Sequence, residues 1–275
     1  MTPVLLALSS ALLFGGMTVG VRLGLRGGGD AAAATLATVL PAFAVTAVAS
    51  AFRFDVNGAW PFLLAGLLAP GGSQILFTLA VREVGASRTS VTVGAAPLAA
   101  VAIALVFLGE PLRLPLLAGA VAIVGGGVLL AGERDRPEHL RALGLGFAVG
   151  ACLLFATRDN LIRALHAHAT PETAAAATMI AGVVVAGAWA RRVPTPRELR
   201  RLAPAGVLFG LSYVCLFEAY FRGRVTVVSP LVATESLWGV LLSVLLIRHT
   251  EAVGRRLALG AALIVAGGIV IGTTR

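Results

Sequence analysis

The sequence predicts an all-α, polytopic membrane protein with ten transmembrane helices, arranged as two inverted five-helix repeats. Three observations support this fold class: the apolar composition, the even spacing of charges and turns, and an internal repeat. Of the 275 residues, 58% are hydrophobic and 13% are charged. A soluble domain has about 45–50% apolar residues with glycine included and about 25% charged residues. The composition therefore excludes a water-soluble fold.

Charges and turn residues divide the chain into segments of bilayer-spanning length. A helix needs about 20 apolar residues to cross about 30 Å of hydrocarbon. Charges and helix breakers gather in short connections, such as Arg26 to Asp30 and Arg191 to Arg201. Ten segments are predicted to span the membrane: 3–22, 31–51, 60–81, 87–108, 114–132, 141–165, 172–190, 203–221, 225–247 and 254–272.

The two halves of the chain resemble each other in sequence, which indicates an internal duplication. Residues of the first half recur 140 to 143 positions later: Leu12, Leu13, Phe14 and Arg22 as Leu153, Leu154, Phe155 and Arg163; 31–35 as 174–178; Leu76, Phe77 and Arg82 as Leu216, Phe217 and Arg222; and eight residues from Glu110 to Gly127 as Glu251 to Gly268. We expect one repeat at 1–132, a loop at 133–140 and a second repeat at 141–275. Because five is odd, the second repeat enters the membrane from the opposite side, as in secondary transporters that alternate between two open states.

Glycine and acidic residues recur at the ends of the two repeats. The first copy has Gly109-Glu110-Pro111 followed by 125–127, and the second has Glu251 followed by Gly267-Gly268. With these features the chain resembles the EamA family of the drug/metabolite transporter (DMT) superfamily over essentially its full length. The resemblance implies ten helices, a central cavity between the halves, and export or exchange of small metabolites, amino acids or drugs. The second copy has His249-Thr250-Glu251 in place of Gly-Glu-Pro. We therefore expect the hinge between the ninth and tenth helices to differ from the hinge between the fourth and fifth.

Four charged residues lie well inside predicted segments: Arg158, Asp159, Glu218 and Glu235. A charge in hydrocarbon costs about 2.5–3.5 kcal/mol, so such residues normally face a cavity or a partner. From the rise of a helix, Arg158 and Glu218 are each expected about 8 Å from the midplane on the same side. Glu235 is expected near the midplane, where transporter sites usually lie.

These charges have a functional and a structural interpretation. In the functional one, Arg158 binds a substrate carboxylate or other anion, and Glu218 or Glu235 neutralises an ammonium group or carries a coupling proton. In the structural one, ion pairs of Arg158 with Glu218, or of Asp159 with Arg163, tie helices together. Both interpretations stay open at this point.

Four further side chains could line the same cavity: Tyr213, Tyr220, Trp238 and Gln74. Tyr213 and Gln74 are polar groups inside apolar segments, and Trp238 follows Glu235 by three residues, which puts both on one helix face. An aromatic wall beside a carboxylate suits a cation, although an ordinary packing role fits Trp238 as well. The candidate substrate-binding residues are therefore Arg158, Glu218, Glu235, Trp238, Tyr213, Gln74 and Asp159.

Several residues are expected to shape helices. Glu110 and Glu251 are predicted to cap the helices that follow them, where the helix dipole favours an acid. The GxxxG pairs at 146–150 and 206–210 predict close helix packing. Ser229-Pro230 is expected to bend its helix near Glu235.

The sequence argues against several other classes of protein. The net charge of +9 comes with no basic and aromatic stripe, so no nucleic-acid partner is expected. The histidines and the two cysteines lack metal-ligand spacing, and no catalytic motif occurs. We therefore expect no metal, no cofactor and no enzyme activity.

Membrane orientation stays open at this stage. Arginines concentrate in the connections opposite both termini, so the positive-inside rule puts the termini outside. The family resemblance implies the reverse, with both termini in the cytoplasm.

The function predicted from these features is secondary active transport of small polar metabolites, most readily amino acids, by alternating access. We expect a monomer or weak homodimer, multi-pass in a prokaryotic cell membrane. Two alternatives remain: a cationic drug/proton antiporter, and a non-transporting membrane scaffold or receptor-like protein.

Overall fold

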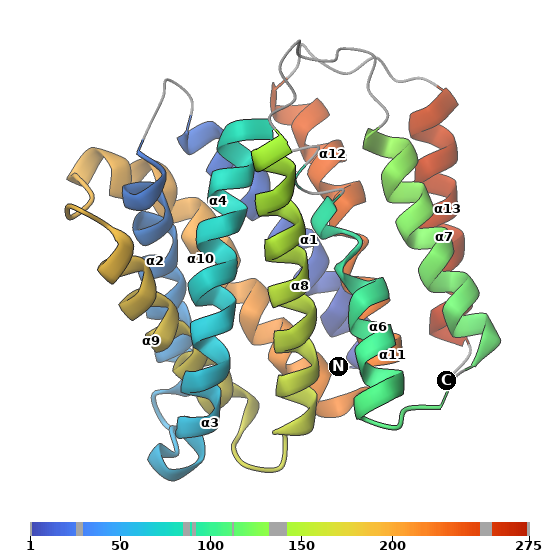
Figure 1. Cartoon of the computed structure of the whole chain (residues 1–275), viewed down its shortest axis with the longest axis horizontal. Coiled ribbons are helices and arrows are strands. Elements are labelled where there is room, and N and C mark those ends of the chain that lie inside the picture. Colours follow the sequence, from blue (N-terminus) through green and yellow to red (C-terminus); the bar gives the residue numbers. More distant parts are fainter. Residues whose placement is uncertain are drawn as a thin grey trace.

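A computed structural model describes residues 2–25, 30–84, 89, 92–111, 113–131, 142–247 and 255–273, and these residues form helices and no strand. The helices are α1 (Pro3–Gly24), α2 (Ala31–Ser50), α3 (Val56–Gly66), the π-helix η1 (Leu67–Gly72), α4 (Ser73–Val84), α6 (Ala96–Phe107), α7 (Leu114–Ala131), α8 (Ala142–Ala164), α9 (Pro171–Trp189), α10 (Pro196–Arg222), α11 (Val225–Val232), α12 (Glu235–Ile247) and α13 (Arg255–Thr273). They pack side by side into one bundle (Figure 1). The predicted loop at 133–140 lies outside the described residues.

Six helical stretches of the described chain are long and apolar enough to cross a membrane: Pro3–Gly24, Ala31–Ser50, Val56–Val84, Leu143–Ala164, Pro171–Trp189 and Pro196–Arg222. Shorter apolar helices cover Ala96–Phe107, Leu114–Leu129 and Ala262–Ile271. The all-helical membrane fold is thereby confirmed. The total of ten spans stays a prediction, because the remaining helices are short or interrupted.

Side-chain caps fix where several helices begin. The side-chain oxygens of Thr2, Asp30, Asp55, Thr170 and Thr195 each accept a hydrogen bond from a backbone N–H in the first turn. These oxygens satisfy donors that have no partner within the helix. The caps lie in the connections between apolar segments, where the sequence places its polar residues.

Helices α7 and α13 lie against each other at one edge of the bundle (Figure 1) and show the inverted symmetry of the repeats. A Cβ atom built on Gly119 would lie 2.9 Å from the carbonyl oxygen of Gly267, and one built on Gly126 would lie 2.6 Å from that of Gly260. Gly119 and Gly260 are equivalent positions of the two repeats, as are Gly126 and Gly267. Each contact is therefore the symmetry mate of the other, as a two-fold axis requires.

The GxxxG pair of α10 packs as predicted. Gly206 lies against the carbonyl oxygen of Thr38 on α2, and a Cβ on Gly210 would lie 2.7 Å from the carbonyl oxygen of Ala42. Only a residue without a side chain permits this approach. In the other pair Gly150 contacts Leu76, while a Cβ on Gly146 would have no described atom within 4 Å.

Three membrane helices are interrupted near the middle of the bundle. The stretch from α3 to α4 departs from helical geometry at Ala69 (φ −147°, ψ 120°). Helix α11 ends at Val232 and α12 begins at Glu235, which confirms the bend predicted at Ser229-Pro230, displaced by about one turn. In the first repeat, residues 94 and 95 form a turn directly before α6. Interrupted helices inside a membrane occur where they are buried in protein or line a cavity.

The expected role of Glu110 needs a correction. Its carboxylate does not cap α7, the next helix in the chain, but accepts hydrogen bonds at the first turn of α11 in the second repeat. Pro111 and Arg113 separate Glu110 from the start of α7 at Leu114, which leaves its side chain to reach a neighbouring helix. Glu251, its repeat equivalent, lies outside the described residues.

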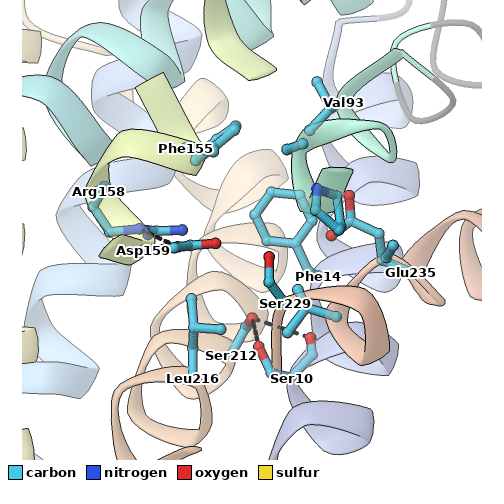
Figure 2. A pocket seen from close by; sticks show the side chains of 14 residues that line it. Ser10, Phe14, Val93, Phe155, Arg158, Asp159, Ser212, Leu216, Ser229 and Glu235 are labelled. Atoms are coloured by element: carbon cyan, nitrogen blue, oxygen red, sulfur yellow. Dashed lines mark hydrogen bonds and ion pairs between the residues drawn. The ribbon is translucent and has the colours of Figure 1, made fainter. Parts of the chain in front are cut away.

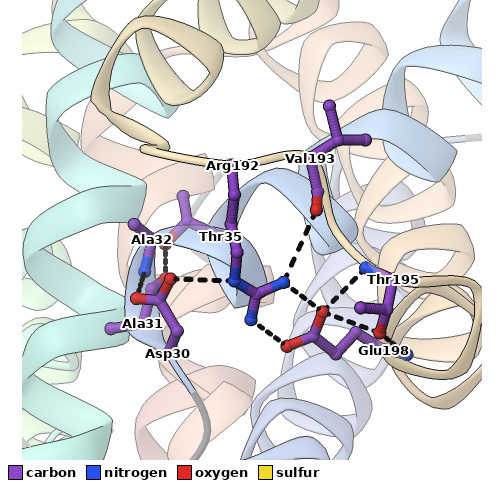
Figure 3. A network of polar contacts seen from close by, with 8 residues as sticks. All are labelled: Asp30, Ala31, Ala32, Thr35, Arg192, Val193, Thr195 and Glu198. Atoms are coloured by element: carbon purple, nitrogen blue, oxygen red, sulfur yellow. Dashed lines mark hydrogen bonds and ion pairs between the residues drawn. The ribbon is translucent and has the colours of Figure 1, made fainter.

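A polar network joins two connections at one end of the bundle (Figure 3). Arg192 donates to both carboxylate oxygens of Glu198, at 2.8 and 2.6 Å, and lies 3.9 Å from Asp30. Glu198 also accepts from the backbone N–H of Thr195 and completes a capping box on α10. The hydrogen bonds to Glu198 raise the pKa of Arg192 above its ordinary value. The network links the start of α2 to the start of α10, and so one repeat to the other.

Candidate functional site

A small cavity lies between the two repeats (Figure 2). The first repeat contributes residues of α1 and α6 and the segment before α6, and the second contributes residues of α8, α10, α11 and α12. The lining residues are Ser10, Phe14, Val93, Ala96, Pro97, Phe155, Arg158, Asp159, Ser212, Leu216, Ser229, Val232, Ala233 and Glu235. The water-accessible volume is about 40 Å³, which is room for about three water molecules.

Two phenylalanines place this cavity beside the pseudo-two-fold axis. Phe14 and Phe155 occupy equivalent positions of the repeats, and their rings meet edge to face with centroids 6.0 Å apart. Equivalent residues can touch only close to the axis that relates them. Phe77 of α4 packs on both rings at 5.8 and 6.5 Å. We call Phe14, Phe77 and Phe155 the phenylalanine cluster.

Arg158 and Asp159 form a buried ion pair on one side of the cavity. Arg158 Nε lies 2.8 Å from Asp159 Oδ1, and the two residues are 4% and 5% exposed. Tyr220 donates its hydroxyl to Asp159 Oδ2 at 2.5 Å. Because the pair is neutral as a unit and hydrogen-bonded, it can remain charged inside the membrane.

The guanidinium of Arg158 also lies close to two aromatic rings. Its Cζ atom is 5.4 Å from the ring centroid of Phe155 and 5.0 Å from that of Tyr213. Arg158 Nη1 and the Tyr213 hydroxyl are buried and have no hydrogen-bond partner among the described residues. The side of the guanidinium that Asp159 leaves free therefore keeps an unused donor.

Glu235 is the first residue of α12 and lines the opposite side of the cavity (Figure 2). It is 7% exposed, and within the described part of the chain its carboxylate takes part in no hydrogen bond or ion pair. The interruption between α11 and α12 brings it there, because residues 233 and 234 turn the chain directly before it. The cavity thus holds one internally neutral ion pair and one acid without a partner.

The two ion pairs considered from the sequence are both wrong. Arg158 does not pair with Glu218, which bonds to Arg222 one turn further along α10 at 2.6 Å. Asp159 does not pair with Arg163, which donates to the carbonyl oxygens of Tyr220 and Phe221. Equal depth alone does not make two residues meet, because the rotation of each helix about its own axis decides which side chains face each other.

The remaining candidates are spread over the bundle. Tyr213 is buried against Arg158, as described above. Trp238 is half-buried, its Cβ packs against Gly15, and it does not line the cavity. Gln74 is fully buried on α4 and Glu218 lies near the end of α10, both outside the set of lining residues. Their roles in substrate binding stay predictions.

Sequence reasoning missed two residues of the site, Ser10 and Ser212, which hydrogen-bond to each other at 2.9 Å in the wall of the cavity. Tyr220 was expected beside the charges, and it donates its hydroxyl to Asp159. Phe14 was noted only as a repeat match. That match was itself the available signal, because large residues kept in both repeats gather where the repeats meet. No sequence pattern marked the two serines.

Among the described residues there is no group of three or more His, Cys, Asp or Glu side chains placed to hold a metal ion. Cys152 and Cys215 are both free thiols.

The chain belongs to the EamA-like transporter family. The sequence profile of that family matches residues 1–132 and again residues 142–273, so each half of the chain is one copy of the family unit. The family is part of the DMT superfamily and consists of membrane transporters.

A solved structure supports the fold independently. A protein whose structure is titled only "Crystal structure of protein" is 20% identical to this chain, with a TM-score of 0.81 over 98% of this chain and 95% of the other. At this identity the likeness concerns the fold alone. Among curated proteins no sequence matches this chain.

Proposed function

We propose that this protein is a secondary active transporter that exports or exchanges small polar metabolites, most readily amino acids, by alternating access between its two repeats. The observation that carries the proposal is the cavity on the pseudo-two-fold axis with its buried charges. Both repeats line the cavity, so a rocking motion of one against the other would open it to either side.

The size of the cavity fits a closed intermediate of such a cycle. Pockets that hold small molecules measure about 300–1,000 Å³, and this one has a water-accessible volume of about 40 Å³. A metabolite therefore enters only after helices around the cavity move apart. The interrupted helix α11–α12 and the turn before α6 are where the lining could bend.

The charges in the cavity suit a zwitterion. A carboxylate would take the free Nη1 donor of Arg158, and an ammonium group would lie against Glu235. The carboxylate and the ammonium group of the substrate both leave water on binding, which is costly unless each finds a partner in the site. A molecule that lacks one of these charges would leave Arg158 or Glu235 without its partner, so the site selects against it.

A specific observation favours a second candidate, an organic cation/proton antiporter. Asp159 already neutralises Arg158 at 2.8 Å, whereas Glu235 has no partner among the described residues. With Glu235 ionised, the cavity carries one uncompensated negative charge. Either an organic cation or a coupling proton would compensate this charge, one at a time. Exchange of one for the other requires such alternation.

Ligand-dependent thermal unfolding of the detergent-purified protein separates these candidates. The panel contains amino acids, nucleosides, sugar phosphates and organic cations, because a ligand at 100 times its Kd stabilises by about 2.7 kcal/mol. We expect amino acids to raise the melting temperature of the wild type and to lose that effect in Glu235→Gln. Glu172→Gln, which alters an acid paired with the exposed Arg53, serves as the matched control and should keep it.

The variant Arg158→Lys further separates the zwitterion site from the organic cation/proton antiporter. Lysine keeps a positive charge for Asp159 but loses the planar group that lies close to the rings of Phe155 and Tyr213. Weakened amino-acid binding with unchanged organic-cation binding supports the zwitterion site. Stabilisation by organic cations alone favours the antiporter, and no stabilisation together with no flux in proteoliposomes favours the scaffold alternative.

We further infer that the protein acts as a monomer or weak homodimer in a prokaryotic cell membrane. The cavity is complete within one chain, because both repeats contribute to it. Cross-linking at increasing protein dilution in liposomes, with flux measured in parallel, tests whether one chain suffices.

A further inference from the structure

Three neighbouring polar side chains on α4 are buried without partners. Gln74 and Ser73 are 0% exposed and Thr78 is 1% exposed. Both amide atoms of Gln74 and the hydroxyls of Ser73 and Thr78 have no hydrogen-bond partner among the described residues. Most buried polar side-chain atoms in proteins have a partner, so a group of four such atoms calls for a bound molecule.

The backbone before Gln74 is also irregular. The π-helix η1 ends at Gly72, directly before Ser73, and the chain leaves helical geometry at Ala69. Single π-helical turns occur frequently at functional sites. At membrane depth, irregular backbone is tolerated where it is buried in protein or lines a water-filled space.

The packing of α4 on α8 places Gln74 beside the cavity. The two helices run in opposite directions, since Gly72 lies against Leu154 and Leu76 lies against Gly150. Gln74 is therefore level with residues 151–153 of α8, one to two turns from Arg158. Phe77 follows Gln74 by three residues on the same face of α4. The phenylalanine cluster thus lies next to both Gln74 and the cavity.

Along α8 the charge nearest to the level of Gln74 is Arg158, one to two turns away. The opposing residues of α8 are Ala151, Cys152 and Leu153, and the charged residues of α4, Arg82 and Glu83, lie more than two turns further on. A site of this kind offers one amide donor, one amide acceptor and two hydroxyls. It fits an uncharged hydrogen-bonding group.

We propose that Gln74, Ser73 and Thr78 form a second subsite that binds an uncharged polar group of the transported molecule, a carboxamide or hydroxyl, while Arg158 and Glu235 hold its charged end. The subsite rests on the proposed transport function. It makes the protein selective for amino acids with amide or hydroxyl side chains over aliphatic ones.

Side-chain selectivity in proteoliposome exchange tests the subsite. Exchange of labelled glutamine, asparagine, serine and threonine is compared with that of leucine and valine, in wild type and Gln74→Leu. Leucine has nearly the size of glutamine but makes no hydrogen bond. We expect about three- to tenfold weaker transport of the polar set, with the aliphatic set unchanged or improved. Thr35→Val, which removes a hydroxyl bonded within its own helix, is the control and should preserve the preference.

Stability measurements distinguish binding from a structural role. Because the amide of Gln74 has no partner among the described residues, Gln74→Leu should leave the melting temperature without ligand unchanged or higher. If Gln74→Leu fails to fold, Ser73→Ala and Thr78→Val should each weaken the polar preference. If the variants change transport of the polar and the aliphatic amino acids equally, the proposed subsite is wrong. Absence of amino-acid exchange in the wild type overturns the proposed function instead.

Discussion

Glu110 of the first repeat binds the backbone of Thr226 in the second. Glu110 Oε2 accepts the Thr226 N–H and Oε1 accepts the Val225 N–H, both at 2.9 Å. These donors belong to the first turn of α11, where the helix has unpaired N–H groups and a positive dipole end. A single carboxylate therefore ties the two repeats together at the end of the bundle where both termini lie (Figure 1).

Glu110→Ala should lower the free energy of unfolding by about 1–2 kcal/mol, the usual effect of losing a helix cap. Glu110→Gln should fall between this variant and the wild type, because the amide keeps one acceptor. Thermal unfolding in detergent measures both. An effect no larger than that of Glu172→Gln, which weakens an ion pair to a largely exposed arginine, would contradict the capping role.

The buried ion pair should show strong coupling in a double-mutant cycle. Arg158→Ala or Asp159→Ala alone leaves one buried charge without its partner and should cost about 3–5 kcal/mol. The double variant removes both charges and should be less destabilised than the two single effects together. Additive losses measured by denaturant unfolding would show that the pair contributes no coupling.

The two buried tyrosines of α10 make a matched comparison. Tyr220→Phe removes the donor to Asp159 and should destabilise the protein by about 1–3 kcal/mol. Tyr213→Phe removes a hydroxyl with no partner among the described residues and should leave stability unchanged or slightly higher. If Tyr213→Phe instead weakens only the ligand-induced shift, its hydroxyl contacts substrate.

Two adjacent glycines of α7 should respond in opposite directions to alanine. A Cβ at position 126 would lie 2.6 Å from the Gly260 carbonyl oxygen, whereas one at position 125 has no described atom within 4 Å. Gly126→Ala should therefore lower the melting temperature. Gly125→Ala should raise stability by about 0.5–1 kcal/mol through reduced backbone entropy. Equal responses would contradict the observed α7–α13 packing.

The surface network should matter mainly through Glu198. Glu198→Ala loses the capping box and should cost about 1 kcal/mol. Arg192→Ala removes an exposed guanidinium and should lower the melting temperature less, by an amount that shrinks as salt is added. Melting curves at low and high salt check both expectations.

The sequence predicts the fold better than the site for a physical reason. Apolar length, breakers and the repeat report on each helix separately, and they correctly indicate an all-helical, duplicated membrane protein. Partner choice depends on helix rotation, which is why Glu218 pairs with Arg222 rather than with Arg158.

Residues close in sequence were also misjudged. Neighbouring residues on a helix normally point in different directions, so an ion pair between Arg158 and Asp159 was not expected. The two side chains pair all the same, and the guanidinium of Arg158 lies close to the rings of Phe155 and Tyr213. The helix that Glu110 caps could not be predicted from neighbouring residues either, because Glu110 and Val225 are more than 110 residues apart in the sequence.

The reciprocal contacts of Gly119 with Gly267 and Gly126 with Gly260 are those of an isologous interface, in which one surface meets a copy of itself. A single five-helix unit would thus carry what it needs to pair with a second copy. In such a symmetric pair, every side chain near the two-fold axis would occur twice. In this chain Arg158, Asp159 and Glu235 occur only in the second repeat. The equivalent positions of the first repeat hold Met17, Thr18 and Gly94. Fusion of the two units into one polypeptide is what allows a single cation, and a single acid without a partner among the described residues, to line the cavity beside the axis.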